Sequence, residues 1–165
     1  MKIDDLEKID FFDNSRLKFE HELSNLNWFN IGGKSRIYLY ANSLKDLSLF
    51  LKKYEKRGKI FILGAGSNTL FDDDTYEGVV IKLGKNFNRL SILNSNIIIS
   101  GTAVSDRKLA EYAAENNLSG FEFLSCIPGT VGGGLKMNAG CFGKEIKDIL
   151  VSIQAIDKKG NVLTI

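Results

Sequence analysis

The segment that decides what kind of protein this is reads GTVGGGLKMNAGCFG and spans residues 129–143. It holds six of the chain's 16 glycines, and the single proline, Pro128, directly precedes it. Glycine loses more backbone entropy on folding than any other residue, so a hydrophobic core gains nothing from such a run. The run suits backbone that approaches a large ligand closely with its N–H groups free to donate. It therefore predicts a cradle for a phosphate-bearing cofactor, with a glycine-rich structural crossover as the alternative.

A second glycine motif, GAGSN at residues 64–68, follows the apolar run Ile60–Leu63. Its glycines allow a sharp turn in which consecutive N–H groups form a nest for an anion, and Ser67 and Asn68 add side-chain donors. The motif lacks the third glycine of the dinucleotide fingerprint and the Gly-Lys-Ser/Thr of a P-loop. Taken alone, it predicts either a phosphate loop or a tight turn.

The polar groups around residues 129–143 are mostly neutral. Thr130, Asn138 and the glycine N–H groups suit a ring system or a pyrophosphate better than a metal ion. Cys126 and Cys141 are predicted to be small buried packing residues, because no histidine lies nearby to activate a thiol. The one histidine, His21, lies between two glutamates and is predicted to be a solvated surface residue outside any zinc site.

The composition is that of an ordinary globular protein. A formal net charge of +2 is too small to favour a nucleic-acid partner, and the apolar runs fall well short of the ~20 residues of a membrane span. The charged N-terminus has no apolar stretch typical of a signal peptide. Two cysteines make no disulfide framework. We therefore expect a cytoplasmic protein that binds neither membranes nor nucleic acid.

The order of predicted elements is mixed. Two helices are expected to begin at the N-cap residues Ser43 and Ser105, the first ending near Gly58. A short helix at 16–20 is possible within an N-terminal arm. Strands are expected at 36–40, 60–63, 79–83, 90–93, 97–99, 151–156 and 162–165. This order predicts an α+β fold with an arm at 1–24, one lobe at 25–84 and a second, incomplete lobe at 85–165.

Four motifs in sequence carry a family resemblance: WFNIGG at 28–33, LGAGSN at 63–68, GFEFL at 120–124, and IPGTVGG at 127–133 with MNAG at 137–140. Over roughly residues 25–165 the chain resembles the bacterial UDP-N-acetylenolpyruvoylglucosamine reductases. The resemblance implies an FAD-binding fold of the vanillyl-alcohol oxidase (PCMH) type. It also implies a cytoplasmic step of peptidoglycan synthesis, in which NADPH reduces FAD and the flavin reduces the enolpyruvyl group of a UDP-sugar.

Carried over by position, the resemblance implies two sets of cofactor-binding residues. The FAD pyrophosphate would lie on Gly64, Ala65, Gly66, Ser67 and Asn68. The pyrophosphate and flavin would be lined by Pro128, Gly129, Thr130, Gly132, Gly133, Asn138 and Ala139. Cys126 departs from the family at a position that is often glycine.

The catalytic arginine, serine and glutamate of the family, and its substrate-binding lobe, would fall after Ile165. Glu122 and Asp148 are predicted to be surface or capping acids rather than replacements for them. We therefore expect a truncated chain with no catalytic residue of its own and no turnover alone. Two alternatives remain open: a flavin oxidoreductase of the same fold with another substrate, and a non-catalytic truncated remnant. The sequence does not indicate an oligomeric state.

Overall fold

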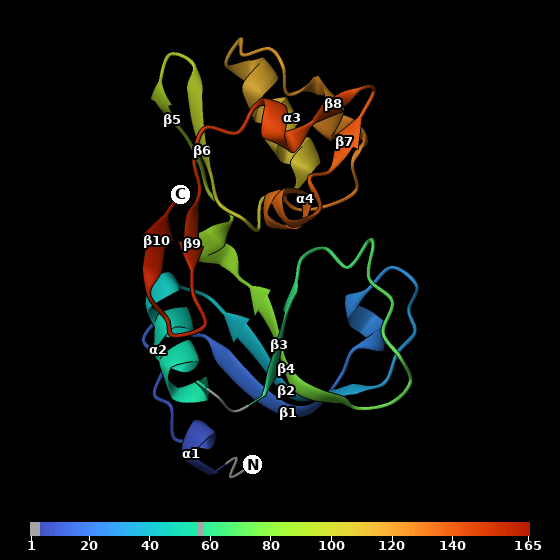
Figure 1. Cartoon of the computed structure of the whole chain (residues 1–165), viewed down its shortest axis with the longest axis vertical. Coiled ribbons are helices and arrows are strands. Elements are labelled where there is room, and N and C mark those ends of the chain that lie inside the picture. Colours follow the sequence, from blue (N-terminus) through green and yellow to red (C-terminus); the bar gives the residue numbers. More distant parts are fainter. Residues whose placement is uncertain (1–3, 56–57) are drawn as a thin grey trace.

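A computed structural model describes residues 4–55 and 58–165 (Figure 1). Its elements form two groups along the long axis of the molecule. One group contains a four-stranded sheet covered by α2, and the other contains α3, α4 and small hairpins. Mixed helices and strands confirm the predicted α+β class. Residues 1–3 of the predicted N-terminal arm lie outside the described residues.

The sheet of the first group has the strand order β1-β2-β4-β3. Its strands are β1 (Arg16–Glu22), β2 (Lys34–Ala41), β3 (Lys59–Leu63) and β4 (Tyr76–Leu83). β1 pairs antiparallel with β2, whereas β2 and β3 both pair parallel with β4. The carboxyl ends of β2, β3 and β4 therefore share one edge of the sheet, where ligand-binding loops of α/β proteins gather.

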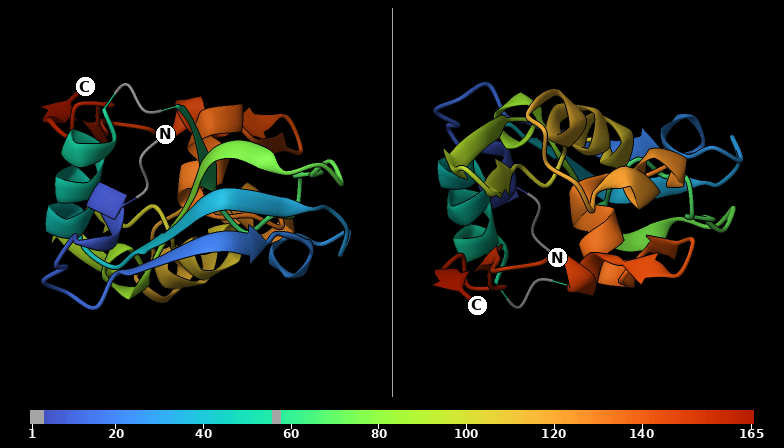
Figure 2. Two further views of the ribbon diagram at one scale, coloured as in Figure 1. Left: turned by 90° about the horizontal axis from the view of Figure 1, so that it is seen from below. Right: turned by 90° about the horizontal axis from the view of Figure 1, so that it is seen from above.

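Both faces of the central strands are buried, which explains their continuous apolar runs. One face packs against α2 (Leu44–Tyr54), and Figure 2 shows this helix alongside the strands. The side chains that meet there are Ile37, Leu39, Val79 and Ile81 from the sheet and Leu47, Phe50, Leu51 and Tyr54 from the helix. The other face holds a separate cluster of Leu23, Tyr38, Leu63 and Val80.

Ser43 and Asp46 fix the start of α2. The Ser43 hydroxyl accepts the Asp46 N–H at 3.2 Å, as predicted for an N-cap. The fully buried Asp46 carboxylate accepts hydrogen bonds from the N–H groups of Phe12 (2.8 Å) and Asp13 (3.0 Å) and from the Ser15 hydroxyl (2.7 Å). One carboxylate thus fastens the N-terminal segment to the helix.

The second group is built on the cluster Val104, Leu109, Phe123, Leu124 and Ile146. The hairpin of β5 (Leu90–Asn94) and β6 (Ile97–Ser100) leads into α3 (Asp106–Glu115), whose N-cap is Ser105 as predicted. The 3₁₀ helix η3 (Glu122–Cys126) and α4 (Val131–Met137) follow. The short pair β7 (Gly140–Cys141) and β8 (Lys144–Glu145) completes the group.

The C-terminal hairpin returns to the first group. It consists of β9 (Gln154–Ile156) and β10 (Val162–Thr164), which lie beside α2 in Figure 1. The Ser48 hydroxyl donates to the Gly160 carbonyl at 2.6 Å, and Ile156 packs against the core beneath α2. Residues 154–164 therefore contact the sheet group, although the sequence assigned them to the second lobe.

The short helix considered at 16–20 is wrong, because these residues form β1. Leu17 and Phe19 alternate with exposed neighbours and pack against the core, a period of two that fits a strand. The rest of the predicted arm is also anchored, since Leu6 in α1 (Asp4–Glu7) and Ile9 are buried. Within the described ranges, no helix has the length and apolar character needed to cross a bilayer.

We predict that Asp46→Asn lowers the free energy of unfolding by about 2–4 kcal/mol at neutral pH, because an amide cannot accept from all three donors. Burial raises the pKa of Asp46, but its hydrogen bonds lower the pKa further, so it lies below the ordinary value. The stabilisation is therefore present above the unfolded-state pKa and is lost as the pH falls through the folded-state pKa. Urea denaturation across acidic and neutral pH measures both effects. The exposed Asp10→Asn is the control, and equal stabilities of the two variants would contradict the assignment.

Candidate functional site

The two predicted glycine segments lie against each other. Gly64 begins the loop at the carboxyl end of β3, and Thr130 and Gly133 belong to the start of α4. A Cβ atom at Gly64 would lie 2.7 Å from the Thr130 Oγ1 and 3.9 Å from the Gly133 Cα. Only glycine permits this approach without displacing the threonine. Segments more than 60 residues apart in sequence thus form one candidate site.

The central part of the glycine run, Val131–Met137, forms the helix α4. Thr130 is the N-cap of α4, and its hydroxyl accepts the Gly133 N–H at 3.4 Å. Glycine is a poor helix former, but here it allows close packing. A Cβ atom at Gly132 would lie 3.0 Å from the Thr102 carbonyl oxygen, and one at Gly134 would lie 2.5 Å from the Ile146 Cδ1. Close packing of the backbone, rather than cofactor binding, therefore explains some of the glycines in residues 129–143.

Most N–H groups at the start of α4 already have partners. The Val131 N–H donates to the Val104 carbonyl and the Gly132 N–H to the Thr102 carbonyl, both at 2.9 Å, while Gly134 donates to Thr130 at 2.8 Å. The expectation of free donors along this run is wrong for these residues. Within the described chain, Gly129 and Thr130 keep N–H groups that donate to no protein acceptor.

The Gly64–Asn68 loop supplies the unpaired donors instead. In residues 4–55 and 58–165, none of the four consecutive N–H groups from Ala65 to Asn68 donates to a protein acceptor. The loop is nevertheless held in shape, because the Trp28 N–H donates to the Gly66 carbonyl at 3.0 Å. Gly66 is buried with φ +74°, and a Cβ there would overlap the Leu26 carbonyl. A fixed row of unpaired N–H groups fits a pyrophosphate.

Sequence reasoning missed two residues that shape this loop. The buried Asn27 amide donates to the carbonyls of Leu23 (3.0 Å) and Ile31 (2.8 Å) and so organises the segment behind Gly66. Lys82, near the end of β4, donates from Nζ to the Gly64 carbonyl at 3.3 Å. Its one sequence signal is a charge directly after the apolar run Val79–Ile81.

Asn138 and Ala139 lie at the other end of α4 from Thr130. Asn138 has φ 47° and ends the helix. Its amide donates to the Glu145 Oε2 at 2.9 Å and accepts the Lys147 N–H at 3.1 Å. Ala139 packs against the second core, and Pro128 is exposed beside Gly129. These contacts are structural, and a role of the three residues in cofactor binding stays a prediction.

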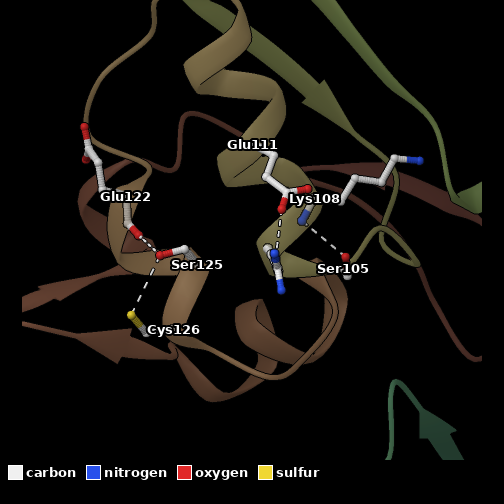
Figure 3. Close-up of polar contacts among 7 residues, drawn as sticks. Ser105, Lys108, Glu111, Glu122, Ser125 and Cys126 are labelled. Atoms are coloured by element: carbon white, nitrogen blue, oxygen red, sulfur yellow. Dashed lines mark hydrogen bonds and ion pairs between the residues drawn. The ribbon is translucent and has the colours of Figure 1, made fainter.

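The reactive side chains nearby are accounted for by local structure. Figure 3 shows Glu122, Ser125 and Cys126 on η3, away from the capped start of α3 at Ser105. The exposed Glu122 carboxylate accepts the Gly120 N–H at 2.9 Å, and Asp148 accepts the Glu145 N–H at 2.9 Å in a capping box, so the first is a surface acid and the second a capping acid.

The structure gives the burial of Cys126, Cys141 and His21, about which the sequence made predictions. Cys126, at the end of η3, is exposed rather than buried and has its Sγ 3.7 Å from the Ser125 Oγ, whereas Cys141 packs against the second core. His21 is half-buried, with its ring 4.3 Å from that of Tyr38, and burial lowers its pKa. No cluster of metal-ligating side chains occurs in the part of the chain that the structure describes.

Asp106 is the most unusual ionisable group of the site. It is fully buried at the first position of α3, and neither carboxylate oxygen has a hydrogen-bond partner among the described residues. A Cβ at Gly129 would lie 2.6 Å from the Asp106 Oδ2, so the carboxyl group lies directly behind the candidate site. Burial raises the pKa of Asp106 to about 6. The group resembled an ordinary first-turn acid in the sequence, which gave no signal of this.

Comparison with known proteins places this geometry in context. The family described as "FAD binding domain" matches residues 35–165. The chain is 57% identical over its whole length to the UDP-N-acetylenolpyruvoylglucosamine reductase of Pelagibacter ubique, of which it covers 55%. It is 42% identical to the reductase of the same name from Orientia tsutsugamushi, with 90% of this chain and 50% of the relative aligned. The chain thus spans about half the length of the curated relatives it matches.

A solved structure supports the same relationship at the level of the fold. The crystal structure of UDP-N-acetylenolpyruvylglucosamine reductase from Thermus caldophilus matches with a TM-score of 0.74 and 25% sequence identity. The match covers 93% of this chain and 53% of that one.

We predict that Asp106→Asn changes stability in a pH-dependent way. The pKa of the Asp106 carboxyl in the folded protein, about 6, lies above its ordinary value of 3.8, so the folded state binds this proton more tightly than the unfolded state does. The resulting contribution to the free energy of unfolding is fully present below about pH 4 and is lost as the pH rises through 6. The asparagine variant should therefore gain up to about 3 kcal/mol relative to the wild type between acidic pH and pH 8. Thermal unfolding across this range measures the difference. Exposed Asp73→Asn is the control, and a pH-independent difference for Asp106→Asn would refute the prediction.

Proposed function

Because the chain belongs to the family of FAD binding domains, we propose that its Gly64–Asn68 loop and the start of α4 hold FAD. The observation that carries the proposal is the row of unpaired N–H groups from Ala65 to Asn68 beside the Thr130 cap. These donors suit the two phosphates of a dinucleotide. When bound, FAD would supply hydride transfer.

The division of roles among the residues follows from their donors. The pyrophosphate would lie on Gly64, Ala65, Gly66, Ser67 and Asn68, with the unpaired N–H groups of Gly129 and Thr130 facing it from the second group. The residues proposed to line the remainder of the cofactor are Pro128, Gly132, Gly133, Asn138 and Ala139. The N–H groups of Gly132 and Gly133 already donate to protein acceptors. These two glycines would therefore allow the cofactor to approach the backbone closely but would not donate hydrogen bonds to it.

For the whole protein we propose the activity that the relatives' names describe. It would reduce a UDP-N-acetylglucosamine enolpyruvate with NADPH as the hydride source, a cytoplasmic step of peptidoglycan synthesis. Within the described residues, the carboxylates of the nearby acids Glu122 and Asp148 accept backbone N–H groups and Asp106 is buried. We therefore propose that proton donation and UDP-sugar binding depend on residues other than these, and that residues 1–165 alone give no turnover.

We predict that the purified protein binds FAD in a one-to-one complex. Removal of the isoalloxazine ring from bulk water should change the visible flavin spectrum and its fluorescence. Titration with FAD measures the change, and circular dichroism establishes that the protein is folded. A folded protein that leaves the FAD spectrum and fluorescence unchanged would sink the proposal. NADPH oxidation that depends on the enolpyruvyl UDP-sugar would contradict only the statement that this chain alone is inactive.

We further predict that Gly66→Ala weakens FAD binding by at least about tenfold, because a side chain at φ +74° beside the Leu26 carbonyl must displace the loop. Gly143→Ala is a matched control, since Gly143 also has a positive φ, +76°, but a Cβ there meets nothing within 4 Å. The Gly143→Ala variant should have similar backbone strain and should keep the FAD affinity of the wild type. Equal affinities of the two variants would show that the Gly66 loop does not touch the cofactor.

A further inference from the structure

Lys82 occupies a central position beneath the candidate site. It lies near the carboxyl end of β4, where its backbone is in register with Leu63 of β3 and Tyr40 of β2. Side chains alternate along a strand, so Lys82 shares a face with Val80 rather than with Ile81, which packs toward α2. Leu63 is the residue directly before the Gly64–Asn68 loop. Lys82 therefore lies beside the start of the Gly64–Asn68 loop.

The Lys82 ammonium is fixed to the loop by a hydrogen bond. Its Nζ donates to the Gly64 carbonyl at 3.3 Å, which uses one of three N–H donors. Lys82 is half-buried, and within the described residues no carboxylate pairs with it. Burial lowers the pKa of Lys82, and in the part of the chain that the structure describes no neighbouring charge offsets that effect.

A half-buried cation without a counter-ion is unfavourable for folding. Tyr40, Leu63 and Val80 surround this position on the sheet face, and an uncharged side chain such as methionine would fill the same space at lower cost. The hydrogen bond to the Gly64 carbonyl requires a donor but not a formal charge, so the positive charge itself has no evident structural function. The Lys82 Nζ is bonded to the carbonyl of Gly64, the residue directly before Ala65–Asn68. The N–H groups of that segment have no acceptor among the described residues and suit an anion.

We propose that Lys82 is a binding residue for the pyrophosphate of FAD, its ammonium supplying the positive charge that the neutral N–H groups of the Gly64–Asn68 loop lack. The proposal rests on the FAD-binding function proposed above and adds a residue to it. A doubly charged pyrophosphate is the counter-ion that the protein itself does not supply. Charge-assisted hydrogen bonds are roughly twice as strong as neutral ones, so this contact would be a main source of affinity.

The proposal makes the affinity depend on pH with a definite sign. An anion beside Lys82 favours its charged form, so the pKa of Lys82 is higher in the complex than in the free protein. The contribution of Lys82 to FAD affinity is therefore full below the free-protein pKa and falls as the pH rises through the pKa of the complex. Ionisation of Asp106, whose pKa is about 6, would separately weaken binding of the anion at lower pH.

The test compares FAD dissociation constants of the wild type, Lys82→Met, Lys82→Arg and Lys53→Met by fluorescence titration. Lys82→Met should bind about 10- to 100-fold more weakly, Lys82→Arg should retain most of the affinity, and the exposed control Lys53→Met in α2 should match the wild type. A wild type that binds FAD no better than Lys82→Met overturns the proposal for Lys82 and leaves FAD binding intact. A folded wild type that binds no FAD overturns the function itself.

A second measurement needs no folded Lys82→Met variant. The Lys82 side-chain resonance, assigned by its loss in Lys82→Arg, is titrated with pH in the free wild type, with FAD and with riboflavin. FAD should raise the pKa of Lys82, whereas riboflavin, which carries no phosphate, should not. An unchanged pKa in the FAD complex would contradict contact between the ammonium and the pyrophosphate.

Discussion

The close approach of the Gly64 backbone to the Thr130 hydroxyl is the contact on which the site depends. The same hydroxyl accepts the Gly133 N–H and so caps α4. A side chain at position 64 would have to displace Thr130 and with it the helix cap, because only 2.7 Å separates the Cβ position from Oγ1. One small contact thus couples the edge of the sheet to the start of a helix and joins the two groups of elements into one site.

Glycine has different functions in the two walls of this site. In α4 the missing side chains allow the helix to lie against Thr102 and Ile146, and the neighbouring carbonyls take up its first N–H groups. In the loop after β3, the glycines allow a turn in which the N–H groups of residues 65–68 find no acceptor among the described residues. A helix N-terminus rich in glycine is therefore not by itself the anion site here, and the sheet edge supplies most of the donors.

Local signals in the sequence predicted the local structure well. Ser43 and Ser105 are N-caps as expected, because capping depends on residues a few positions apart. The differences between the predictions and the structure involve distant partners. Arg16–Glu22 becomes a strand because β2 is beside it, and the 154–164 hairpin returns to α2 through Ser48 and Ile156. Residues 131–137 of the glycine run become helical, and the N–H groups of Val131 and Gly132 meet the carbonyls of Val104 and Thr102, which no local pattern reveals.

Lys82 and Asp106 show why the chemistry of the site could not be read from residue types alone. Each is an ionisable group that the fold buries without an opposite charge. Protonation leaves Asp106 neutral in the acidic range, whereas the same proton makes Lys82 a cation. An anionic cofactor would relieve the desolvation of Lys82 and would be repelled by an ionised Asp106 behind Gly129. Burial alone favours the neutral form of both groups, whereas a bound anion would favour a positive Lys82 and a neutral Asp106.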